Sequence, residues 1–128
     1  MSTEMLALLL AALLCLLLPL VYSFLYQRQV GVKGTMGNRE TVAPPTGAAA
    51  RGLRAHQNLL ENLLPFAIVV LAAQHLAVTN ALTVAGALLF LGARVVHALC
   101  YLFGVTVIRS LAYLAGLIGT LMIGWQLF

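Results

Sequence analysis

One stretch of the chain places two cations, an amide and a carboxylate at the start of a hydrophobic segment. The four side chains follow one another at steps of three, four and three residues: Arg51, Arg54, Asn58 and Glu61. With 3.6 residues per helical turn, they fall within roughly 80° of one another on a helical wheel. A charged stripe entering a bilayer is costly unless it faces protein or a water-filled cavity. We therefore expect this stripe to face the interior of a helix bundle.

A second group of polar residues follows later in the chain. Arg94, His97 and Tyr101 are spaced i, i+3 and i+7, which again is one face of a helix. A further cluster lies just beyond, at Arg109, Ser110 and Tyr113. An arginine guanidinium binds carboxylates in a bidentate fork, and a glutamate can bind an amine. Together the two groups predict a site for a small polar anion that carries carboxylates and an amine.

Glu61 and Arg94 are candidates for an ion pair. Each lies ten residues from the expected cytoplasmic end of its segment, or about 15 Å deep at 1.5 Å per residue. Unpaired charges at that depth are rare. The sequence therefore predicts that these two side chains pair inside the bundle.

The composition predicts an all-α integral membrane protein. The chain has 128 residues, of which 62% are hydrophobic and 8% charged, and its mean hydropathy is +1.03. A soluble domain of this length could not bury so much apolar surface. The net charge of +4 is better explained by cytoplasmic loops than by a nucleic-acid partner. Cys15 and Cys100 lie in apolar runs, and the three histidines have no metal-ligand spacing, so no metal site is expected.

We expect one domain with four helices and one long loop. The predicted helices cover about 5–25, 51–76, 81–103 and 108–128, and residues 27–50 form a polar cytoplasmic loop, a lid or more simply a mobile linker. Lys and Arg are concentrated in this loop and at the start of the fourth segment, whereas both termini lack them. The positive-inside rule then places both termini away from the cytoplasm.

Small residues recur every four positions in the last segment. They are Ala112, Gly116, Thr120 and Gly124. Such a ridge allows another helix to approach closely. It fits a contact within the protomer and a subunit interface equally well.

The two polar stretches resemble the MAPEG superfamily, the membrane-associated proteins in eicosanoid and glutathione metabolism. The first resembles the family signature in the pattern Arg51-x-x-Arg54-Ala55-His56-x-Asn58-x-x-Glu61-Asn62-x-x-Pro65-Phe66. The second resembles the third and fourth helices in the pattern Gly92-Ala93-Arg94-x-x-His97-x-x-x-Tyr101-Leu102, followed by Arg109. The pattern is most similar to the microsomal glutathione transferase and microsomal prostaglandin E synthase branch. The loop resembles bacterial members, which implies a bacterial inner membrane.

The resemblance implies a homotrimer with glutathione as co-substrate, bound between subunits near the cytoplasmic face, and a lipophilic substrate in contact with membrane lipid. It implies that Arg109 is catalytic and stabilises the glutathione thiolate. The implied glutathione-binding positions are Arg51, Arg54, Asn58, Glu61, His97, Tyr101, Ser110 and Tyr113. The turn between Tyr101 and Arg109 is one residue shorter than in the animal enzymes, so we expect a shifted register of the fourth helix and with it a shifted position of Arg109.

Two other functions fit the same residues. The superfamily includes a member that binds lipid and a partner enzyme without catalysis, so a non-catalytic trimeric scaffold or lipid-binding protein is the main alternative. A small transporter subunit is a third hypothesis, although the chain has no internal repeat to support it.

Overall fold

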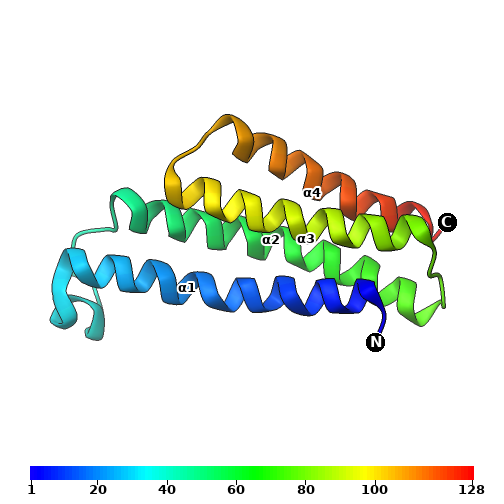
Figure 1. Cartoon of the computed structure of the whole chain (residues 1–128). Helices are drawn as coiled ribbons and strands as arrows, with labels where there is room; N and C mark the ends of the chain where they lie inside the picture. Colours follow the sequence, from blue (N-terminus) through cyan, green and yellow to red (C-terminus); the bar gives the residue numbers. More distant parts are fainter.

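The computed structural model describes all residues 1–128 as a bundle of four α-helices (Figure 1). The helices are α1 (Thr3–Met36), α2 (Gly47–His75), α3 (Ala81–Phe103) and α4 (Val107–Trp125). They run up and down, so the start of α1 and the end of α4 lie at one end of the bundle. The α1–α2 and α3–α4 connections lie at the other end. The all-α prediction is confirmed.

The long loop is shorter than predicted. Residues 27–30 continue the first part of α1, and after a break at Gly31 (φ 75°) a second, short helical part covers residues 32–36. Residues 47–50 already belong to α2, since Ala48, Ala49 and Ala50 are the strongest helix formers. Only residues 37–46 remain outside helices. Pro19, which could have kinked α1, lies within helical geometry.

The core is centred where α1, α2 and α3 meet. Phe66 of α2 and Phe90 of α3 are fully buried and stack face to face, with ring centroids 3.7 Å apart. Buried alanines surround this pair, among them Ala7, Ala11 and Ala73. Small side chains let the three backbones approach closely enough for the two rings to fill the space between them.

Helices α3 and α4 approach each other closely at two glycines. A Cβ added to Gly86 would lie 2.6 Å from the carbonyl oxygen of Gly119, and a Cβ on Gly119 would lie 2.6 Å from that of Gly86. Ala112 and Gly116 of the predicted ridge are buried against α3, whereas Thr120 and Gly124 are half-buried. The first half of the ridge, Ala112 and Gly116, therefore packs within the protomer. The close contact with α3 is made by Gly119, one residue before Thr120 of the ridge.

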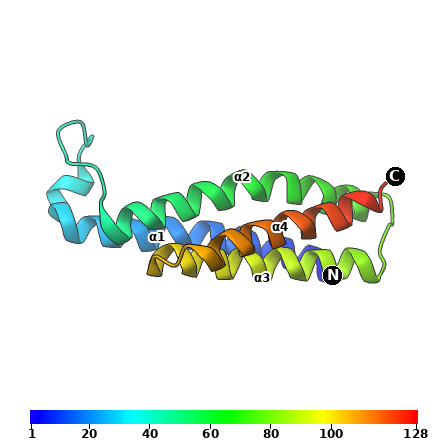
Figure 2. The same cartoon turned by 90° about the horizontal axis from the view of Figure 1, so that it is seen from above.

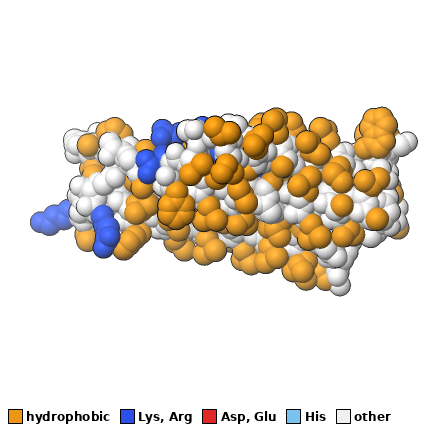
Figure 3. Space-filling view, turned by 45° about the horizontal axis from the view of Figure 1, so that its top comes forward, with side chains coloured by type: hydrophobic (Ala, Val, Ile, Leu, Met, Phe, Trp, Pro, Cys, Tyr) orange, Lys and Arg blue, Asp and Glu red, His pale blue; other side chains and the backbone are white.

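The surface is that of an integral membrane protein. Helices α1, α3 and α4 are long and apolar enough to cross a membrane, and leucines cover their outer faces. Figure 3 shows hydrophobic side chains along the whole bundle and Lys and Arg side chains gathered at one end. Helix α2 lies beside the other three, but polar side chains between Arg51 and Asn62 interrupt its apolar surface.

Candidate functional site

A pocket of about 330 Å³ opens at the cationic end, between the end of α3 and the start of α4. Three helices contribute its lining, which is Asn58, His97, Tyr101, Arg109, Ser110, Tyr113 and Leu114. Six of these seven residues were predicted as site residues from the sequence. Residues of the two polar groups therefore meet at one place, although Asn58 and His97 are 39 residues apart in the chain.

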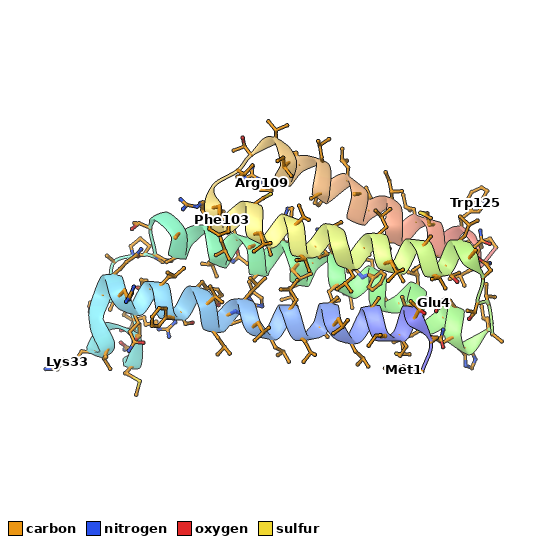
Figure 4. The ribbon with its side chains drawn as sticks, viewed as in Figure 1. Met1, Glu4, Lys33, Phe103, Arg109 and Trp125 are labelled. Atoms are coloured by element: carbon orange, nitrogen blue, oxygen red, sulfur yellow. The ribbon has the colours of Figure 1, made fainter.

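The α3–α4 turn brings Arg109 to the pocket. Gly104 ends α3 in the left-handed conformation (φ 79°), and the amide of Val105 donates to the carbonyl of Cys100. This tight helix end needs glycine, because other residues are strained at positive φ. Helix α4 begins three residues later, and the Arg109 guanidinium lies over the Tyr101 ring, 4.7 Å from its centroid. Figure 4 shows Arg109 near Phe103, at the α3–α4 connection. The shorter turn thus keeps Arg109 at the site.

The pocket combines a cation with aromatic walls. The His97 side chain is buried, and its ring meets the Tyr101 ring edge to face at 5.0 Å and the Tyr113 ring at 6.4 Å. The Arg109 guanidinium is half-buried, and its contact within the protein is the face of the Tyr101 ring instead of a hydrogen-bond acceptor. Its N–H groups are therefore available to an anion that enters the pocket.

Arg94 lies beneath the pocket and holds one of its walls in place. Its side chain is 1% exposed, and its Nη1 and Nη2 donate to the amide oxygens of Asn58 (3.1 Å) and Asn62 (3.2 Å). The Asn62 amide nitrogen donates in turn to the Asn58 carbonyl (2.8 Å). Because the Asn58 side-chain oxygen is engaged, its amide N–H groups are the part that can serve a ligand.

The predicted Glu61–Arg94 pair is wrong within the protomer. Arg94 is held by two neutral amides, and Glu61 is exposed. The two residues lie at a similar depth in the bundle, but Glu61 is on the outer side of α2 and does not point toward Arg94. Asn62 was not predicted as a partner of Arg94. Its i+4 spacing from Asn58 nevertheless indicates that the two amides lie on the same face of α2.

The remaining predicted positions lie outside the pocket lining. The Arg51 guanidinium donates to the carbonyls of Tyr101 (3.0 Å) and Leu102 (3.2 Å), and so caps the end of α3. Arg54 and Glu61 are exposed on α2. The expectation that the whole stripe faces the bundle interior is therefore wrong for these two, which point away from the protomer core on the side that carries Asn58.

The model of the MAPEG family matches residues 5–128. The chain belongs to the MAPEG family. A search of curated proteins finds no significant match. The family includes glutathione-dependent transferases and peroxidases, commonly uses glutathione and is typically trimeric.

A second, apolar cavity of this MAPEG protein lies between α2 and α4. It measures about 610 Å³ and is lined mainly by aliphatic and aromatic side chains. It runs from Asn62 and Pro65 on α2 to Trp125 and Phe128 at the end of the chain. Because Asn62 also binds Arg94, this groove begins next to the polar network and continues away from it along the bundle. The sequence contained no clear signal for the groove, because helical periodicity does not predict how far apart two helices lie.

Proposed function

We propose that the protein is a glutathione-dependent membrane transferase or peroxidase that acts on lipophilic electrophiles. The observation that supports this most directly is the pocket in which Arg109 adjoins Asn58, His97 and Tyr101. Glutathione carries two carboxylates, an amine and a thiol, and this set of donors suits such a ligand. Family membership adds that glutathione is a common co-substrate of its relatives.

In the proposed reaction, Arg109 stabilises the thiolate of bound glutathione. A free thiol has a pKa near 8.5, and a neighbouring cation lowers it, so that more of the nucleophile is present at neutral pH. With an aryl halide, the thiolate sulfur forms a bond to the ring carbon, the halide leaves with the bonding electrons, and the thiol proton passes to water. The apolar groove next to Asn62 gives a lipophilic substrate a place to lie in contact with the membrane.

We propose further that the working form is a homotrimer with glutathione between subunits at the cytoplasmic face. Arg54 and Glu61 are exposed beside Asn58, so a neighbouring subunit would be needed to enclose them with the ligand. The cation-rich end of the bundle would face the cytoplasm, and both termini would face away from it. The resemblance in the loop favours a bacterial inner membrane. Native mass spectrometry from mild detergent should show a trimer, and a persistent monomer would contradict this part of the proposal.

The decisive experiment is conjugation of an aryl chloride with glutathione by the purified protein. Arg109→Ala should lower turnover by roughly 10²- to 10³-fold, the effect of removing one preorganised electrostatic stabiliser. Lys33→Ala, which removes an exposed cation far from the pocket, serves as the control and should retain wild-type turnover. If Arg109→Ala retains full turnover, Arg109 does not stabilise the thiolate.

The groove also supports the alternative of a non-catalytic trimeric scaffold or lipid-binding protein. Thermal stabilisation by glutathione separates the two functions, because a ligand at 100 times its Kd stabilises the native state by about 2.7 kcal/mol. A protein with neither turnover nor stabilisation by glutathione would fit the alternative.

A further inference from the structure

Helix α1 is longer than a membrane requires. About 20 helical residues cross the hydrocarbon of a bilayer, whereas the first, unbroken part of α1 already runs from Thr3 to the break at Gly31. The end of this part therefore extends beyond the apolar layer, at the cationic end of the bundle. At Gly31 the helical geometry is interrupted, and residues 30–42 fold to one side of the helix axis, as Figure 2 shows in cyan. We call residues 30–42 the hook.

Hydrogen bonds fix the hook at its base. The Tyr26 hydroxyl donates to the carbonyl of Ala43 (2.6 Å). Gln29 and Thr46 exchange two hydrogen bonds, since the Gln29 amide donates to the Thr46 carbonyl (2.9 Å) and accepts from its N–H (3.1 Å). Within the hook, Val42 packs back toward Gly34. The segment therefore has a defined position instead of behaving as the mobile linker that its composition suggested.

The tip of the hook is both apolar and cationic. Val32 is 59% exposed and Met36 82% exposed, one helical turn apart on the same side. Lys33 lies between them, is exposed, and has no acceptor in the protein. Figure 4 shows Lys33 at the extreme end of the molecule, directed away from it. These side chains are exposed, so they are free to contact a surface outside the protomer.

The charge of this segment is one-sided. Arg39 lies three residues past Met36, and its guanidinium donates to the carbonyl of Thr35 while remaining exposed. Glu40 is the only acidic residue in 27–50. Because α1 itself crosses the membrane, the hook is held at the level of the lipid headgroups. The charged groups available at that level are phosphates.

We infer that the hook binds the headgroups of anionic phospholipids. Val32 and Met36 lie against the headgroup layer, and Lys33 and Arg39 contact the phosphates. Apolar burial combined with charge is what gives surface segments stable membrane contact. Each cation near an anionic surface contributes about fivefold in affinity, and Glu40 opposes one of the two cations, so the net charge of the hook gives a preference of roughly fivefold for anionic over zwitterionic lipid.

Brominated lipids test this contact at the hook itself. The only tryptophan, Trp125, lies at the opposite end of the bundle, so Trp125→Phe combined with Met36→Trp moves the fluorescent reporter to the hook. The protein is placed in phosphatidylcholine vesicles that contain increasing fractions of brominated phosphatidylglycerol or brominated phosphatidylcholine at low salt. Phosphatidylglycerol should reach half-maximal quenching at a several-fold lower mole fraction than phosphatidylcholine.

The charge dependence is tested in the same background. Lys33→Gln with Arg39→Gln should remove the preference, and Lys33→Arg with Arg39→Lys should preserve it. Since Arg39 also caps the end of α1, Lys33→Gln alone is a second variant that keeps the cap and should lose about fivefold. Equal quenching by both lipids would overturn the headgroup preference, and no quenching by either would overturn membrane contact.

Glutathione binding provides an independent readout. The hook variants should bind glutathione as the wild type does, because the hook contributes no residue to the pocket lining. The lipid result therefore stands or fails separately from the proposed enzyme activity.

Discussion

Gly116→Ala tests whether Arg94 is held as tightly as its contacts suggest. A Cβ at this position would lie 2.5 Å from Nη2 of Arg94 and 2.8 Å from its Nε, whereas ordinary contact begins at 3.4 Å. The guanidinium would have to move by about 0.9 Å. A buried side chain that already bridges Asn58 and Asn62 at 3.1 and 3.2 Å cannot move that far and keep both bonds.

The expected cost follows from those bonds. Losing one hydrogen bond to a charged group costs about 1.5–3 kcal/mol, and replacing a helical glycine with alanine returns about 0.5–1 kcal/mol. Gly116→Ala should therefore lower the free energy of unfolding by roughly 0.5–2.5 kcal/mol. It should also weaken glutathione binding, because Asn58 loses the partner that orients its amide.

Gly92→Ala is the matched control. Gly92 is also a helical glycine, but an added Cβ there would meet nothing within 4 Å. This variant should be more stable than the wild type by about 0.5–1 kcal/mol and bind glutathione unchanged. Unfolding in mixed detergent micelles, followed by circular dichroism, measures both variants. If the two variants prove equally stable, the Arg94 side chain can move without losing its hydrogen bonds, and it does not hold Asn58 in place.

Two further variant pairs test other contacts. Thr83→Val should cost roughly 1–3 kcal/mol in unfolding free energy, because the buried Thr83 hydroxyl donates to the Glu4 carboxylate (2.6 Å) and accepts from the Asn80 N–H in the cap of α3 (2.9 Å). The exposed Thr79→Val is the control, and equal stability of the two variants would show that these hydrogen bonds contribute nothing. Arg51→Gln should lower stability by about 1–2 kcal/mol through the loss of its bonds to the end of α3, whereas Arg54→Gln, at an exposed position, should leave stability unchanged and weaken glutathione binding in an isothermal titration. The reverse assignment of these two effects would make Arg51 the ligand residue and Arg54 the structural one.

Spacing along single helices was enough to predict most of the pocket. Arg94, His97 and Tyr101 lie on one face of α3, and Arg109 follows a turn too short to carry it elsewhere. These relations depend on the 3.6-residue period and on helix ends, both of which are local properties of the sequence.

Relations between helices were harder to predict, because they depend on how each helix is rotated about its axis. Glu61 and Arg94 matched in depth, but α2 presents Asn58 and Asn62 to α3 and keeps Glu61 on the outside. Arg51 caps the end of α3, and this contact depends on where α3 ends relative to α2. The spacing of residues within α2 does not predict that position. The length of α1 was underestimated for another reason, since polar residues beyond the bilayer continue a helix as readily as apolar ones do.

The neutral partners of Arg94 have a consequence for the electrostatic potential of the pocket. An arginine paired with a carboxylate would contribute little field at a distance, but the amide oxygens of Asn58 and Asn62 solvate the guanidinium without cancelling its charge. Charge interactions are several times stronger in a low-dielectric interior than in water. The Arg94 charge therefore adds to that of Arg109, and the pocket is cationic before any ligand arrives. An anion that enters the pocket neutralises the charges of Arg94 and Arg109. Ligand binding therefore also removes the excess positive charge at this place in the bundle.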